Sequence, residues 1–316
     1  MPPTPPYFQL PMTPAVPKPP SASHTSTPSN TTTTTTDQRP LPQPARKPLL
    51  RLQLHDLSSP GASSFLSLLS LPTCLDECIA GVLQHLYSTS TTTTPSTSIP
   101  PTRSVSLVLR SMPGVAFTRS LDLDADHKEI HLSTDYISSI PSSRRRDELL
   151  GVLRHEMVHC WQWNACGSAP GGLVEGIADW VRLRSGFVPP HWKREADGDW
   201  DAGYQHTGYF LEYLEERFGE GTVRGINEGL REGKYEEKAF WGERFGCGVA
   251  ELWTEYGKSL KKKEEEEGGN DKEGKDKGDG DRGDGEETNR KSGVENGTKK
   301  EEEAVQEEGK SGGSHR

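Results

Sequence analysis

Apolar residues recur at every second position in two short stretches of the chain. Residues 49–54 carry leucine at positions 50, 52 and 54, and residues 105–109 carry Val, Leu and Leu in the same rhythm. A period of two is typical of a β-strand with one buried face. Residues 115–118 and 129–133 predict two more strands. We therefore expect a sheet in the first half of the folded part of the chain.

Later in the chain the apolar residues follow helical spacing instead. Residues 73–87 predict an amphipathic helix that Thr73 can cap, and a long helix follows Ser142 and Ser143, either of which can cap it. The apolar stripe of that long helix consists of Leu149, Leu150, Leu153, Met157 and Trp161. Further helices fit residues 173–185, 202–218, 222–231, 235–241 and 249–260. Strands that come early and helices that come late predict an α+β fold.

Composition limits the folded part to the middle of the 316 residues. Residues 1–47 are rich in Pro, Ser and Thr, and residues 259–316 are rich in Lys, Glu, Gly and Asp. Neither end has enough apolar surface to offset the entropy of ordering, so we expect two disordered tails. Between them we expect one domain at 48–258, with a low-complexity insert at 88–101.

Charge and segment composition exclude several classes of partner. The net charge of −10 argues against a nucleic-acid-binding protein, which needs a basic face. No apolar run is long enough to span a bilayer, and no basic segment followed by an apolar one marks a secretory signal. We therefore expect a monomer without membrane or nucleic-acid partners, either cytoplasmic or secreted by a non-classical route.

Five cysteines are present and none forms a CxxC pair. Cys74 and Cys78 lie four residues apart in a predicted helix, where they have two interpretations. They are either metal ligands, which the spacing permits, or small core residues in a reducing compartment, and we favour the second interpretation.

The long helix contains the sequence His-Glu-Met-Val-His at residues 155–159. Positions i and i+4 of a helix lie on one face, so His155 and His159 can reach the same metal ion. Glu156 lies one step around the helix, where it can contact a water on that metal. Two imidazoles that bind Zn²⁺ and a carboxylate that accepts a proton from water are the parts of a zinc hydrolase. We therefore expect His155 and His159 as zinc ligands and Glu156 as the general base.

A third ligand is expected from the next helix. Catalytic zinc has three protein ligands and one open position. Glu175 and Asp179 are again at i and i+4, so Glu175 can bind the metal while Asp179 accepts the free ring N–H of a zinc histidine. Gly176 would let the two helices approach closely. The metzincin pattern has a histidine six residues after the second one, and this chain has none after His159.

Each of these side chains also has a plainer interpretation. His155 and His159 fit a solvated helix face, and Glu156 fits a surface charge. Glu175 fits a carboxylate favoured by the dipole at a helix start. Asp179 fits a surface carboxylate, or it takes the place of Glu175 as the third ligand. The neighbouring Met and Val residues make the segment half buried, which favours the metal site, because buried polar groups need partners.

Three stretches resemble the plant basic secretory protein family. They are residues 155–164 (HEMVHCWQWN), residues 169–186 (APGGLVEGIADWVRLRSG) and residues 200–204 (WDAGY). The resemblance covers roughly residues 51–260 and implies a zincin-like metallopeptidase that acts on a peptide or protein substrate. It implies a mixed sheet leading into the HExxH helix, followed by a mostly helical C-terminal part. The strand at 129–133 would then be the edge strand that pairs with an extended peptide.

The chain differs from that family in three respects. It is acidic, it shows no signal peptide, and it carries long low-complexity segments, which suggest a fungal-type relative. An extracellular location and a role in defence, both known for plant members, are therefore alternatives here. The WDAGY motif makes Tyr204 a candidate donor to the oxyanion, with His206 and Tyr209 as alternatives and a core aromatic as the plainer interpretation of Tyr204.

Two functions thus follow from the sequence. The first is a zinc-dependent peptidase with a gluzincin-like glutamate as its third ligand. The alternative is a zinc-containing binding or defence-related protein of the same fold that does not cleave. The alternative has no use for Glu156, so this carboxylate favours the peptidase.

Overall fold

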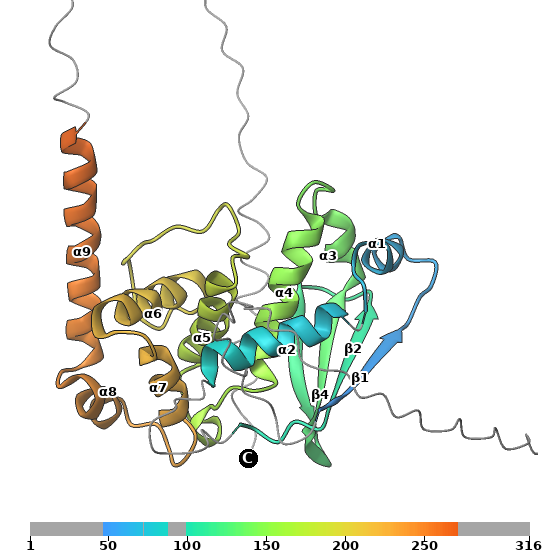
Figure 1. Ribbon diagram of the computed structural model, residues 1–316, viewed down its shortest axis with the longest axis horizontal. Coiled ribbons are helices and arrows are strands. Elements are labelled where there is room, and N and C mark those ends of the chain that lie inside the picture. Colours follow the sequence, from blue (N-terminus) through green and yellow to red (C-terminus); the bar gives the residue numbers. More distant parts are fainter. Residues whose placement is uncertain (1–46, 72, 88–98, 271–316) are drawn as a thin grey trace, which may run out of the picture. The chain divides into compact units, whose positions relative to one another are not determined.

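The computed structural model describes residues 47–71, 73–87 and 99–270 of the chain. Figure 1 labels its helices and strands in chain order. Residues 1–46, 271–316 and 88–98 lie outside the described residues. They hold nearly all of the expected N-terminal tail, most of the expected C-terminal tail and most of the expected insert.

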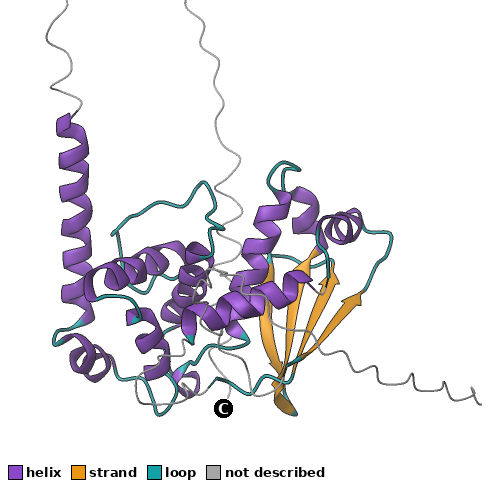
Figure 2. Cartoon of the chain, viewed as in Figure 1, coloured by secondary structure: helices purple, strands orange, loops and turns teal. Residues whose placement is uncertain are grey.

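A four-stranded mixed sheet has the order β1-β2-β4-β3. Its strands are β1 (Leu49–Leu54), β2 (Ser104–Arg110), β3 (Ala116–Leu121) and β4 (Asp124–Ser133). The first three in that order run parallel, and β3 is antiparallel to β4. The register aligns Leu107 with Ile130, and both are fully buried because their alternating side chains face the core. In Figure 2 the strands gather at one side of the helices.

The prediction that residues 129–133 form the edge strand is wrong. We expected residues 129–133 at the edge, but they belong to β4, which pairs with β2 on one side and β3 on the other. Ile130 and Leu132 are fully buried, as side chains of a central strand are. The edge next to them is formed by β3, whose burial pattern is mostly exposed. The periodicity of a strand reports which face is buried but says nothing about its neighbours.

Two helices lie between β1 and β2 in the chain, and a third follows β4. They are α1 (Pro60–Leu68), α2 (Thr73–Leu86) and α3 (Thr134–Ser139), of which only α2 was predicted. Both missed helices are short and begin after a serine whose hydroxyl accepts a backbone N–H, Ser59 for α1 and Ser133 for α3. A serine cap therefore gave a signal that the apolar pattern of such short segments does not give.

The long helix α4 (Arg145–His159) begins later than expected. Its N-cap residue is Arg144, whose side chain makes no capping hydrogen bond, so neither Ser142 nor Ser143 caps the helix. Asp147 and Glu148 in the first turn complement the helix dipole instead. The helix is buried from Leu149 to Val158 because α2, α5 and β3 pack against it.

Helix α5 (Gly171–Arg184) packs against α4 on one side and α6 (Tyr204–Phe218) on the other. We expected Gly176 to permit the contact with α4, and this is wrong. A Cβ at Gly176 would lie 2.3 Å from Thr207 Cγ2, so this glycine permits the contact with α6. Gly151 of α4 plays the expected part, since a Cβ there would meet the Arg182 side chain at 2.7 Å.

The remaining helices are α7 (Thr222–Gly229), α8 (Glu237–Phe245) and α9 (Val249–Asn270). We expected disorder from residue 259, but α9 continues to Asn270. Lys and Glu have high helix propensity, and Lys262 and Glu266 form an i,i+4 ion pair, so a segment whose one large apolar residue is Leu260 still extends the helix. A small mixed sheet with many helices confirms the α+β class.

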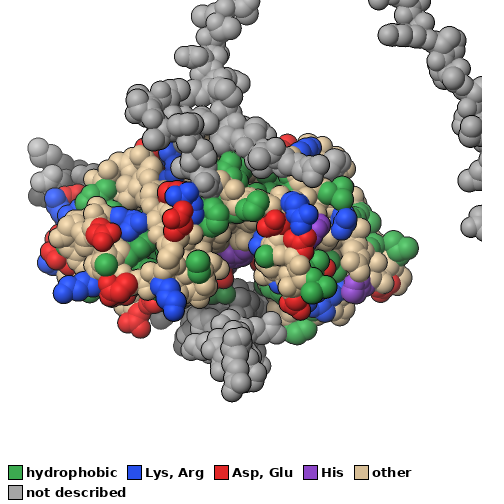
Figure 3. Space-filling view, turned by 90° about the horizontal axis from the view of Figure 1, so that it is seen from below, with side chains coloured by type: hydrophobic (Ala, Val, Ile, Leu, Met, Phe, Trp, Pro, Cys, Tyr) green, Lys and Arg blue, Asp and Glu red, His purple; other side chains and the backbone are tan. Residues whose placement is uncertain are grey.

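Among the described residues no single helix is long and apolar enough to cross a membrane. Helices α1 and α2 pass such a test only as a pair, by length and composition, with a bend of 72° between them. On the face drawn in Figure 3, acidic and basic side chains of the described residues are interspersed.

Candidate metal centre

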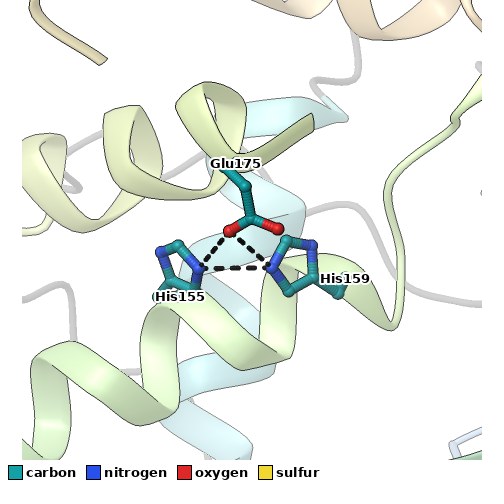
Figure 4. A group of neighbouring side chains, drawn as sticks. All are labelled: His155, His159 and Glu175. Atoms are coloured by element: carbon teal, nitrogen blue, oxygen red, sulfur yellow. Dashed lines mark hydrogen bonds and ion pairs between the residues drawn. The ribbon is translucent and has the colours of Figure 1, made fainter. Parts of the chain in front are cut away.

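Two adjacent helices carry the predicted site residues. His155, Glu156 and His159 lie in the last turns of α4, and Glu175 and Asp179 lie in the first three turns of α5. Figure 4 shows both imidazoles pointing from α4 towards the Glu175 carboxylate above them. The ring centroids of His155 and His159 are 4.9 Å apart at an angle of 80°. The structure thus brings the two histidines and Glu175 together.

Three donor atoms converge between the helices. The Nε2 atoms of His155 and His159 are 3.2 Å apart, and Glu175 Oε2 lies 3.0 Å from the first and 3.6 Å from the second. Ligand atoms of the three residues all lie within 4.8 Å of one another. Within residues 47–71, 73–87 and 99–270, no other group of three or more such side chains converges in this way.

Both imidazoles are oriented through their other ring nitrogen. His155 Nδ1 lies 2.6 Å from Asp179 Oδ1, and Asp179 is 2% exposed. His159 Nδ1 lies 2.7 Å from Gln162 Oε1, while Gln162 Nε2 donates to the Val174 carbonyl at 3.0 Å. Both acceptors hold a proton on Nδ1, which leaves each Nε2 lone pair directed at the common centre.

Gln162 was missed in the sequence, although it stands in the motif that carries the resemblance. It follows the end of α4, so helical spacing does not predict where its side chain points. A polar residue between Trp161 and Trp163 is the only signal for it in the sequence. The structure shows that Gln162 links the His159 ring to the backbone beside Glu175.

The electrostatics of the cluster favour positive charge at its centre. Burial lowers the pKa of His155, but Asp179 and Glu175 together outweigh burial and raise it well above its ordinary value. The pKa of His159 is raised as well, because Glu175 outweighs burial there. Burial raises the pKa of Glu175, but the two imidazoles have the larger effect and lower it to well below its ordinary value. A cation at this place meets a carboxylate that stays ionised.

The donor set fits zinc. Tetrahedral zinc with bonds of about 2.0–2.1 Å has ligand atoms about 3.3 Å apart. The observed separations of 3.2, 3.0 and 3.6 Å bracket that value. Two nitrogens and one carboxylate oxygen leave one position of a tetrahedron open, as catalytic zinc sites do. His155, His159 and Glu175 are therefore able to hold the ion, while Asp179 faces the far side of the His155 ring.

The Glu156 carboxylate is not one of the three converging donors and contacts strand β3. Its side chain is buried, and the Thr118 hydroxyl of β3 lies 2.6 Å from its Oε2 and 3.0 Å from its backbone carbonyl. Thr118 was not a candidate in the sequence, because nothing in the pattern places β3 beside α4. The carboxylate thus stands next to the donor cluster and does not belong to it.

Tyr204 also reaches the site, at the start of α6. Its ring lies parallel to His155 with the centroids 6.4 Å apart, and its φ of 48° is in the left-handed region. Burial is the main cause that raises the pKa of the Tyr204 hydroxyl, and the charges of Glu175 and Asp179 raise it further. Tyr209 contacts Trp192 and Arg194 instead. Tyr204 is therefore better placed for substrate than Tyr209.

The cysteines do not join the site. All five are free, and Cys74 and Cys78 lie in the hydrophobic core. Cys160 follows His159 but its sulfur lies 3.8 Å from the Glu156 carbonyl. Burial raises the pKa of the Cys160 thiol, which keeps it protonated and a poor ligand.

Comparison with known proteins identifies the family. A family model described as BSP, peptidase of plants and bacteria, matches residues 47–256. This stretch includes α4 and α5 with the whole donor cluster. Among curated proteins and among solved structures, none matches the chain. The resemblance to basic secretory proteins is confirmed, and the chain belongs to the BSP family, the peptidases of plants and bacteria.

Proposed function

We propose that this peptidase is zinc-dependent and zincin-like in its site and topology. His155, His159 and Glu175 hold Zn²⁺, with Asp179 behind His155 and Gln162 behind His159. The observation that supports this assignment is the convergence of two Nε2 atoms and one carboxylate oxygen within 4.8 Å. Zinc bound there would supply Lewis-acid chemistry, polarising the scissile carbonyl and making a water acidic.

In this proposal Glu156 transfers the protons, and two other residues orient the imidazoles. Glu156 accepts the proton of the attacking water and later donates it to the leaving amine. Its position one residue after His155 supports this role, because it keeps the carboxylate near the cluster without making it one of the converging donors. Asp179 and Gln162 hold the two imidazoles in the tautomer with a free Nε2.

The substrate is a peptide or a protein segment in extended form. Among the described strands β3 lies at the edge of the sheet, and it packs against α4, so a peptide that pairs with β3 would lie beside the donor cluster. Tyr204 is our candidate for a donor to the oxyanion. The Tyr204 hydroxyl makes no hydrogen bond with any described residue, and its left-handed φ is a strain typical of functional positions.

Metal removal tests the proposed function. Purified protein should contain one zinc per chain, measured by elemental analysis, and should cleave a generic protein substrate such as casein. Dialysis against a chelator should abolish cleavage, and added Zn²⁺ should restore it, whereas Mg²⁺ should not, because imidazole ligands disfavour it. Full cleavage by protein that is shown to be metal-free contradicts the proposal. Zinc uptake without any cleavage supports the binding-protein alternative.

The role of Gln162 can be tested through metal affinity. Gln162→Met keeps the length of the side chain but removes the acceptor for His159 Nδ1 and the donor to the Val174 carbonyl. We expect the affinity for zinc to fall about 10–100-fold, the usual cost of losing a hydrogen bond behind a metal ligand. Competition with a chromophoric chelator measures this. Gln84→Met is the matched control, since Gln84 is exposed on α2. Equal affinities in both variants contradict the role.

A further inference from the structure

The edge strand touches the candidate base directly. Thr118 is in the middle of β3, and its Oγ1 lies 2.6 Å from Glu156 Oε2 and 3.0 Å from the Glu156 carbonyl oxygen. A threonine hydroxyl has one proton, which it donates to one acceptor at a time. The shorter contact is to the carboxylate, and a bond to an ionised acceptor is the stronger one. The hydroxyl therefore holds Oε2 of Glu156.

The strand around Thr118 is held on both sides. Arg119 is directly opposite Glu129 of β4 and donates two hydrogen bonds to its Oε2, at 2.8 and 2.6 Å. Phe117 is opposite His131, and the two rings stack with centroids 4.6 Å apart. These neighbours point to the other face of the sheet, because successive side chains of a strand alternate. The Thr118 hydroxyl is thus fixed against α4 by contacts that use none of the outer edge of β3, where no other described strand pairs.

We propose that Thr118 is a positioning residue for hydrolysis, which fixes the Glu156 carboxylate through Oε2 and leaves Oε1 for the attacking water. This inference rests on the proposed function. Oε1 of Glu156 makes no hydrogen bond with any residue that the structure describes, in agreement with this division. Because Thr118 belongs to the strand on which a peptide would pair, substrate and base are positioned by the same element.

Two substitutions separate the hydroxyl from the shape of the side chain. Thr118→Val keeps the branched shape and removes the hydrogen bond, whereas Thr118→Ser keeps the hydroxyl. With a fluorogenic peptide that the wild type cleaves, we expect kcat of Thr118→Val to fall about 10–100-fold, the usual effect of losing one hydrogen bond to a charged group. KM should stay within about twofold, because the hydroxyl contacts the base and not the peptide. Thr118→Ser should recover most of kcat.

Further measurements separate positioning from folding. Zinc content and melting temperature should match those of the wild type in Thr118→Ser and Thr118→Val. If the valine lowers the melting temperature, Thr118→Ala lacks the same hydroxyl without any branched methyl and carries the same expectation for kcat. In the Glu156→Gln background, Thr118→Val should lower kcat by a clearly smaller factor than in the wild type, because Thr118 acts through the carboxylate.

The outcomes differ for the two proposals. A wild type that binds no zinc or cleaves no peptide refutes the proposed function itself. An active wild type whose Thr118→Val variant keeps full kcat refutes only the role of Thr118. A serine variant as slow as the valine variant also refutes it, since the hydroxyl alone would not then explain the loss.

Discussion

Glu156→Gln is expected to keep its zinc and to lose about 10³-fold in kcat on a protein or peptide substrate, because general acid–base catalysis contributes on this order. The amide cannot accept the proton of the attacking water at neutral pH. It can still accept the hydrogen bond from Thr118, so the packing of α4 on β3 should survive. Glu156 is not one of the three converging donors, which is why the metal content should not change.

The matched control for this variant is Asp147→Asn. Asp147 lies on the same helix, its side chain is 75% exposed, and the change from carboxylate to amide is the same. We expect full activity and full zinc content in the control, each measured by the same assays. Cleavage at the wild-type rate by Glu156→Gln would refute the mechanism, whatever its metal content.

Glu175→Gln and Asp179→Asn form a second pair with unequal expected effects. Glu175 Oε2 faces both Nε2 atoms, whereas Asp179 Oδ1 faces the Nδ1 of His155. Loss of a ligand should lower zinc affinity about 10³-fold, since binding of about 10–16 kcal/mol shared among three protein ligands is about 3–5 kcal/mol for each. Asp179→Asn keeps an acceptor for His155 Nδ1 and removes only the charge behind the ligand, so it should lower zinc affinity by no more than about 10–100-fold.

This pair decides between the two carboxylates that the sequence leaves open. Zinc affinity is measured for both variants by competition with a chelator at one pH, since metal binding competes with protonation. We expect Glu175→Gln to be the weaker binder and Asp179→Asn to retain metal at micromolar zinc. The reverse order would make Asp179 the ligand. The melting temperature of each metal-free variant shows whether the fold has survived.

Much of the donor cluster could be predicted because helical spacing determines it. His155 and His159 at i and i+4 had to share a face of α4, and Glu175 and Asp179 had to share a face of α5. Two short-range rules thus predicted four of the side chains that meet. Convergence of the two faces needed only that consecutive helices pack together, which is usual for neighbours in the chain.

The parts that were missed depend on contacts between distant segments. Thr118 meets Glu156 because β3 pairs outside β4, and no periodicity within β3 or β4 records which strand lies at the edge. The mistake about residues 129–133 has the same cause. Gln162 reaches His159 by a turn of the chain after α4, where helical spacing no longer applies. Gly176 was assigned to the wrong neighbour because a small residue reports a close approach and not its partner.

The donor cluster joins two stretches of chain that are separated by the segment between His159 and Glu175. An ion bound by both would close this segment into a ring, in the way a disulfide closes a loop, and would restrict the unfolded chain. Binding only to the folded state also stabilises it by mass action. The metal would then stabilise the contact between α4 and α5 in addition to its chemical role. Removal of zinc would weaken that contact and abolish the activity at the same time.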